Sequence, residues 1–414
     1  MDSAAAVLPP QKPDIAALDR EVETVLEDLR PALGAIIAQL RPPVRRAIDL
    51  RKVLGLSQTV CWGIFSAVKA PDLRAMTSLL PGSRGMQLFF DASEVSGVPA
   101  EVVKKGRAAF ERFEETVTRH AGSRAAFEAM VSGLSTKDDP QESHANLLKH
   151  KRSVFRGASV LVGRQMRVAC QTFILHPSSQ GTPGLLDSVY IGGSIGLHRI
   201  RHDVPLQMRA RFRYEADPGT PGADAGPQPL DQREPGPGGI GLLRAFCSQP
   251  IPEFRPSEKI GNAQVFELVT GSVGVSSEVT VFEGYIMRAS ASSGSEHGLA
   301  RYVQVPCEVY MGDILVHQSL FEGRTPADPE VQVYAAPAPA DAGFRDSDLL
   351  PMTERGEYLG KGFYAARTTV IPRYEELLAH TMKLTGWNGE EFHVFRCRVD
   401  YPLLSSRIRM TLRC

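Results

Sequence analysis

Long hydrophobic runs are missing from this sequence, which argues against a membrane-spanning helix. No stretch reaches the roughly 18 consecutive apolar residues that a bilayer-crossing helix needs. The first 14 residues, MDSAAAVLPPQKPD, also lack the basic start and apolar core of a secretory signal. We therefore expect no membrane partner, a cytoplasmic location and a disordered tail over residues 1–12.

Closely spaced cysteines are also missing. The chain has six cysteines in 414 residues, and none lies close to another in the sequence. They are Cys61, Cys170, Cys247, Cys307, Cys397 and Cys414. This spacing argues against a disulfide framework and against CxxC zinc sites. We expect reduced, mostly buried thiols, as is usual in the cytoplasm.

The enzyme motifs GxxxxGK[ST] and HExxH are absent as well. The glycine run from Gly192 to Gly196 resembles a phosphate-binding loop, but it lacks a lysine and a following helix, so it predicts a turn between strands. His198 and His202 have the spacing of a metal pair on a helix, yet the residues around them predict strands. We expect no catalytic residue, no metal and no cofactor, although an unlocated active site in residues 151–414 stays open.

The net charge is zero, because 47 basic residues balance 47 acidic ones. A basic field over the whole chain, as many nucleic-acid-binding proteins have, is therefore absent. Residues 41–84, however, contain eight basic and two acidic residues, a local surplus of six positive charges. Such a patch could hold the phosphates of DNA. A solvated basic face on a helical domain is the other interpretation, and charge alone does not separate the two.

Residues 45–69 have the pattern of two short helices joined by a tight turn. The first runs from Ala47 to Leu54, and Gly55 follows it at a position where helices often end in a left-handed residue. Ser57 is a good N-cap for the second helix, because its hydroxyl can accept a hydrogen bond from an unpaired backbone N–H. The apolar residues of the second helix recur at helical spacing, and they are Val60, Cys61, Ile64 and Val68.

The segment Leu54-Gly55-Leu56-Ser57-Gln58-Thr59 resembles the helix-turn-helix of bacterial DNA-binding regulators. The resemblance is limited to about residues 45–69. It implies that one set of side chains reads bases and that another set holds phosphates. The base-reading set is Ser57, Gln58, Thr59, Trp62 and Ser66, and the phosphate-binding set is Arg45, Arg46, Arg51, Lys52, Lys69 and Arg84.

Two departures from the helix-turn-helix pattern point to an alternative. Arg51 stands where a small residue, usually alanine, is expected at the closest approach of the two helices. The outer face of the second helix carries Trp62 and Gly63, with no arginine or lysine before Lys69. The alternative is an ordinary helical hairpin inside an all-α domain.

Helical spacing continues on both sides of this hairpin, so we expect one all-α domain over residues 13–150. Residues 13–40 have an apolar seam close to a heptad pattern, with a break or kink near Pro31. The seam could pack within its own domain or pair two copies into a homodimer. Further helices are expected over residues 72–80, 86–92, 99–120 and 123–134, with a sharp loop at residues 81–85.

Residues 151–414 predict a mainly antiparallel β domain, either a sandwich or barrel-like, so the fold class is α+β. Strands are expected at residues 167–174, 187–197, 206–214, 265–269, 278–287, 301–310, 314–318, 395–401 and 407–413. One amphipathic helix is expected over residues 372–384. Residues 218–239, with six prolines and six glycines, predict a disordered insertion, and residues 336–342 predict a smaller one.

These patterns favour a cytoplasmic, bacterial-type transcriptional regulator that binds duplex DNA through its N-terminal domain. The β domain would then sense an unknown ligand or hold a protein partner. The alternative is a structural or protein-interaction protein, without enzymatic activity, whose helical domain does not contact DNA.

Overall fold

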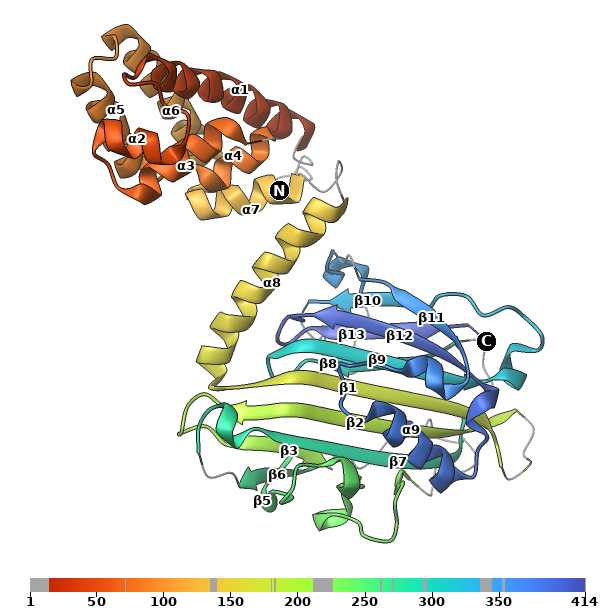
Figure 1. The fold of residues 1–414 in the computed structure, drawn as a ribbon. Coiled ribbons are helices and arrows are strands. Elements are labelled where there is room, and N and C mark those ends of the chain that lie inside the picture. Colours follow the sequence, from red (N-terminus) through yellow and green to blue (C-terminus); the bar gives the residue numbers. More distant parts are fainter. Residues whose placement is uncertain are drawn as a thin grey trace, which may run out of the picture. The chain divides into compact units, whose positions relative to one another are not determined.

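A computed structural model describes residues 15–70, 72–134, 140–179, 181, 184–210, 226–260, 263–269, 272–292, 296–335, 345–351 and 354–413. The chain divides into two compact units, Met1–Asn146 (unit 1) and Leu147–Cys414 (unit 2). Unit 1 is helical and unit 2 is built mainly on antiparallel sheet, so the predicted α+β class is confirmed (Figure 1). None of the helices in these ranges is both long enough and apolar enough to cross a membrane.

Unit 1 has a single apolar core enclosed by helices. Their bounds are α1 (Ile15–Gln39), α2 (Ala47–Leu54), α3 (Gln58–Lys69), α4 (Leu73–Leu79), α5 (Ser83–Val95), α6 (Ala100–Ala121) and α7 (Arg124–Leu134). Helices α1 and α6 lie close together at Gly106, where a Cβ atom would come within 2.6 Å of Ile36 Cδ1. The rings of Phe113 and Phe127 meet edge to face, with centroids 5.8 Å apart, and join α6 to α7.

Helix α1 corrects one expectation and bears on another. It continues through Pro31, which is exposed, while Leu29 and Leu33 on either side are fully buried. Burial of these neighbours offsets the backbone hydrogen bond that proline removes. Along residues 19–40 the apolar seam faces the core of unit 1, with Leu26 and Ile36 also fully buried. The seam is thus used within its own domain, and the structure does not support a homodimer through residues 13–40.

Two other helix bounds differ from the expected ones. The loop at residues 81–85 is shorter than predicted, because α5 begins at Ser83 with Gly82 as its N-cap. The expected domain boundary at residue 150 falls inside α8 (Pro140–Val162). Within unit 2, the last part of α8 is held by a buried ion pair between Lys151 and Glu354.

Unit 2 is organised around a seven-stranded sheet with the order β11-β12-β9-β1-β2-β7-β4. Neighbouring strands are antiparallel except β1 and β9, which are parallel. The bounds are β1 (Arg164–Pro177), β2 (Leu185–Arg199), β4 (Gln228–Pro229), β7 (Val279–Ser292), β9 (Cys307–His317), β11 (Gly356–Lys361) and β12 (Phe392–Asp400). Strand β1 contributes side chains to two apolar cores, because Ala169 and Leu175 face one side of the sheet while Cys170 and Ile174 face the other.

Different elements cover the two faces of this sheet. Helix α9 (Tyr374–Thr385) packs on one face, where Leu377 and Leu378 are fully buried (Figure 1). Two three-stranded sheets share a core with the other face, which agrees in part with the predicted sandwich. One contains β3 (Leu206–Ala210), β5 (Glu253–Ile260) and β6 (Ala263–Val269), and the other contains β8 (His297–Tyr302), β10 (Glu330–Tyr334) and β13 (Arg407–Leu412).

Three predictions in unit 2 need correction. Residues 301–310 do not form one strand, because β8 ends at Tyr302 and β9 begins at Cys307, and β9 continues over the separately predicted strand at 314–318. Strands β5, β10 and β11 were not predicted. The proline- and glycine-rich segment is structured over residues 226–239, where β4 pairs with β7 and Leu230 is 7% exposed. Residues 1–12, 218–225 and 336–342 lie outside the described residues.

Candidate functional site

The expected pair of helices is present in unit 1 as α2, a turn and α3. Gly55 follows α2 with φ +68° and ψ 15°, and its N–H donates to the carbonyl oxygen of Arg51 at 2.9 Å. Ser57 precedes α3 in an extended conformation, and its Oγ accepts a hydrogen bond from the Val60 N–H at 3.4 Å. Leu50 of α2 and Ile64 of α3 are both fully buried in the core of unit 1. The turn therefore forms as the sequence predicts.

The predicted base-reading residues gather on the outer face of α3. At 3.6 residues per turn, the positions from Gln58 to Lys69 that point outward fall within an arc of about 100°. They are Gln58, Thr59, Trp62, Ser66 and Lys69, of which Ser66 is half-buried and the other four are exposed. Ser57 is exposed at the start of the same face. The side chain of Trp62 is 55% exposed, which is unusual for an aromatic residue on a helix packed into a core.

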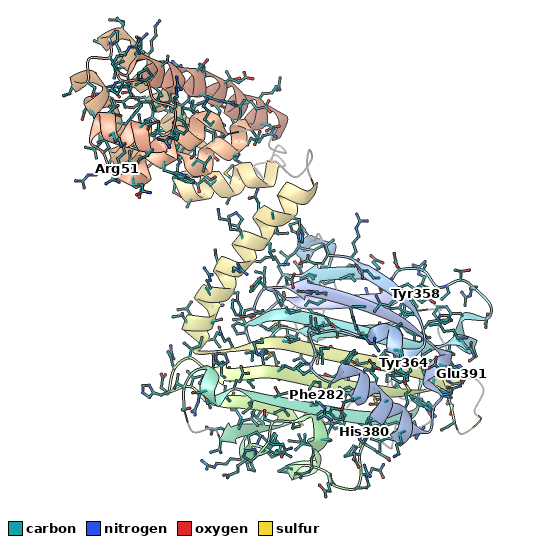
Figure 2. All side chains as sticks on the ribbon, in the orientation of Figure 1. Arg51, Phe282, Tyr358, Tyr364, His380 and Glu391 are labelled. Carbon is teal, nitrogen blue, oxygen red and sulfur yellow. The ribbon has the colours of Figure 1, made fainter. Side chains whose placement is uncertain are left out.

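Two positions on the hairpin differ from the expected arrangement. Gly63, expected on the outer face, is buried, and a Cβ atom there would lie 2.7 Å from the carbonyl oxygen of Leu79. The segment from Leu79 to Pro81 therefore closes one side of the outer face. Arg51, which departs from the helix-turn-helix pattern, is exposed at the surface of α2, and Figure 2 shows it at the outer edge of unit 1. It therefore does not separate the two helices.

Some cations near the hairpin are neutralised by neighbouring carboxylates. Arg46 lies 3.4 Å from Asp49, and the backbone N–H of Arg46 also donates to that carboxylate at 2.9 Å. Desolvation opposes ionisation of Asp49, but the hydrogen bonds from Arg45 and Arg46 outweigh it and lower the pKa of Asp49. Arg74 contacts Asp19 and Glu23 of α1 at 2.7 and 2.9 Å, so this arginine ties α4 to α1.

Other cations of the predicted phosphate-binding set have no such partner. Within the described part of the chain no carboxylate lies within ion-pair distance of these side chains, and all of them are exposed. They are Arg45, Arg51, Lys52, Lys69 and Arg84. The hairpin thus presents a polar helix face with a solvent-exposed tryptophan, next to exposed cations that form no ion pair with the described part of the chain.

Comparisons with protein-family models, with curated proteins and with solved structures found no match to this chain. The function must therefore be inferred from the residues of this chain, and the positive charge of residues 41–84 is the feature that most favours DNA binding. Arg46 and Arg74 form ion pairs within unit 1, and the other basic side chains of residues 41–84 face solvent.

The glycine run in unit 2 does not form the predicted turn. Residues 192–196 lie inside β2, where Gly193 packs against Cys170 and Phe282. The run also has the G-x-S-x-G spacing of hydrolase nucleophile turns, a match that the sequence interpretation missed. That motif requires a sharp strand-to-helix turn at the serine, and Ser194 instead lies within a strand that pairs on both sides. The spacing therefore does not indicate a nucleophile.

The histidine and cysteine signals of unit 2 are explained by packing. His198 is buried, with its Nδ1 3.0 Å from the carbonyl oxygen of Gly196, whereas His202 is exposed. Among the described residues no cluster of three His, Cys, Asp or Glu side chains could hold a metal ion. Burial raises the pKa of Cys170 to about 12, so its thiol is protonated at neutral pH.

A buried polar network holds α9 against the large sheet. Both carboxylate oxygens of Asp313 accept hydrogen bonds from the Arg396 guanidinium, at 2.8 and 2.7 Å. The hydroxyl of Tyr374 donates to Asp313 at 2.8 Å and lies 2.7 Å from the hydroxyl of Thr172. Because these groups satisfy one another across three strands and a helix, we assign them a structural role.

Proposed function

We propose that this chain binds duplex DNA through α2 and α3 and acts as a transcriptional regulator. The observation that supports this most is the exposed polar face of α3, beside cations that no carboxylate of the described residues neutralises. A helix of this width fits the major groove, where a glutamine such as Gln58 can pair with adenine. Unit 2 would serve as the sensing or interaction domain of this regulator.

The contacts that we propose follow from which side of α3 is open. Leu79 and Pro81 cover Gly63 on one side, and the residues proposed to contact bases lie away from them: Ser57, Gln58, Thr59, Trp62 and Ser66. Exposed Arg51 would contact phosphate on the α2 side, with Lys52 next to it. Phosphate contacts of this kind orient the protein on DNA and give most of the non-specific affinity.

The salt dependence of binding tests this proposal. The affinity of the full chain for a labelled mixed-sequence duplex is measured by fluorescence anisotropy over a series of KCl concentrations. Each phosphate contact contributes about −0.9 to the slope of log K against log salt. The double variant Arg51→Gln, Lys52→Gln should therefore flatten the slope by about 1.8.

A matched variant elsewhere in unit 1 serves as the control. Lys104 and Lys105 are adjacent, exposed residues of α6, and the described residues place no carboxylate within ion-pair distance of either. Replacing both by glutamine removes the same charge without touching the hairpin, so the slope should stay at the wild-type value. The proposal is wrong if the wild-type chain does not bind duplex at about 50 mM salt, or if both double variants flatten the slope equally.

A second candidate function is docking of a protein partner on the same hairpin. Ile48 of α2 is 39% exposed and Trp62 of α3 is 55% exposed, so the surface has apolar as well as polar character. Exposed tryptophans are frequent anchors of protein interfaces. Binding of such a partner would depend on Trp62 and respond only weakly to salt, which is opposite to the expectation for DNA.

A further inference from the structure

Unit 2 contains a polar cavity between the large sheet and the two smaller sheets. Its volume is about 90 Å³, and it is lined by residues of β1, β2, β7 and β9 in the large sheet together with residues of β3, β6 and β8. Polar groups converge there, and they include Tyr190, Ser194, Glu283, Arg301 and Tyr310. Gln304 also lines the cavity and is exposed, which places one end of it at the molecular surface. The cavity is small, so a ligand inside it must be small as well.

Arg301 is the cation of this cavity. Strand β8 places it there, half-buried, and no hydrogen bond or ion pair to its guanidinium occurs among the described residues. Desolvation disfavours its charge, but Tyr190, Tyr310 and Glu283 outweigh that effect and raise the pKa of Arg301. The guanidinium is therefore charged, and Glu283 is the carboxylate that helps to stabilise this charge. Because no described group accepts a hydrogen bond from the guanidinium, its N–H donors can bind an anion in the cavity.

The acidic group of the cavity is held in place by its neighbours. Tyr285 donates to Glu283 Oε2 at 3.0 Å and fixes this carboxylate. A Cβ atom on Gly192 would lie 2.9 Å from the Tyr190 hydroxyl and 3.2 Å from Glu283 Oε1, so these two polar groups lie over the glycine, where a side chain would otherwise stand. The cavity is thus lined by one cation, one carboxylate and two tyrosine hydroxyls.

We propose that this cavity binds a small monocarboxylate whose oxygens pair with Arg301. The carboxylate of Glu283 in the same cavity disfavours a dianion such as hydrogen phosphate, and it favours a ligand that carries a hydrogen-bond donor beside its carboxylate. The volume admits molecules of the size of acetate or glycolate. This site lies wholly in unit 2, and it stands whether or not the hairpin binds DNA.

Calorimetric unfolding of the full chain tests the site. The probes are acetate, glycolate and phosphate at pH 7.5, each exchanged for chloride at constant ionic strength. Acetate and glycolate should raise the Tm of wild-type protein by about 3 °C or more at tenfold excess over Kd, with glycolate the stronger. Arg301→Met, which keeps the length of the side chain but not its charge, should abolish the rise without lowering the Tm in chloride.

Two further variants keep the test decisive if Arg301→Met fails to fold. Gly192→Ala retains Arg301 but forces the Tyr190 hydroxyl and the Glu283 carboxylate to move, so it should weaken glycolate binding at least threefold. Lys361→Met removes an exposed cation of β11 outside the cavity, so its response should equal that of wild type. The proposal is overturned if neither carboxylate shifts the Tm of wild type, if Arg301→Met or Gly192→Ala responds fully, or if phosphate stabilises more than the carboxylates do.

Discussion

Single glycines determine the geometry of the hairpin. Gly55 adopts the left-handed conformation that the sequence predicts. A glycine between two apolar helical patterns indicates this conformation, because helices commonly end with a left-handed glycine. Gly63 was placed on the outer face by helical periodicity, and that was wrong. It lies at the edge of the outward arc, and its burial depends on Leu79 and Pro81, which local periodicity does not include. Residue spacing therefore predicts the centre of a helix face better than its borders.

Gly55→Ala tests the conformational role of the turn. No atom lies within 4 Å of a Cβ built on Gly55, so the cost comes from its φ of +68° and not from a clash. We expect unit 1 to lose about 1–2 kcal/mol of unfolding free energy, measured by urea denaturation. Gly157→Ala is the control in unit 2, because Gly157 lies in helix α8 with the same open space, and its effect is measured on the unfolding of unit 2. That change should stabilise by up to about 1 kcal/mol, and a loss at Gly157 equal to that at Gly55 would contradict this explanation.

At the scale of elements, long periodic segments were predicted well and short polar ones were not. Helices α6 and α7 and strands β2 and β12 lie close to their expected bounds, because their apolar residues repeat over several turns or pairs. Strands β5, β10 and β11 were missed, since each is defined by its partner strand more than by its own pattern. Pro306 separates β8 from β9, where the sequence alone suggested one continuous strand.

A histidine stack between β1 and the turn after α9 makes unit 2 sensitive to acid. The ring of His176 stacks on Trp387, with centroids 4.7 Å apart and planes inclined by 5°, and His317 meets it edge-on at 4.7 Å. Desolvation and the nearby His317 lower the pKa of His176 below its ordinary value of 6.5. The unfolded chain therefore takes up a proton first as the pH falls. Stability should be complete above pH 6.5 and decrease below it.

Urea denaturation followed by tryptophan emission measures this effect. Between about pH 7.5 and 5.5, the free energy of unfolding of wild type should fall, and His176→Gln should show a smaller fall. His380 and His393, whose pKa values desolvation also lowers, would contribute the remainder. An equal fall in wild type and His176→Gln would show that the stack has no part in it.

At the scale of the whole molecule, the sequence predicts a helical region followed by a strand-rich region, and the structure has two units. It could not predict the cavity, because the lining residues come from seven strands that only the sheet topology brings together. Arg301 carried no sequence signal, since an arginine in a strand usually faces solvent. Ser194 lies in a glycine run that predicts only a turn, and its place in the cavity follows from the register of β2 with β7.

The central claim is that the outer face of α3 contacts DNA, and Trp62 reports on it directly. The chain has two tryptophans, of which Trp62 is 55% exposed and Trp387 is 8% exposed. Titration of wild type with duplex DNA at low salt should change the tryptophan emission, because the Trp62 side chain moves from solvent into contact with the major groove. The Trp62→Phe variant should still bind, through its cations, but without that change. Binding that leaves the emission of Trp62 unaltered, or no binding at all, would contradict the account.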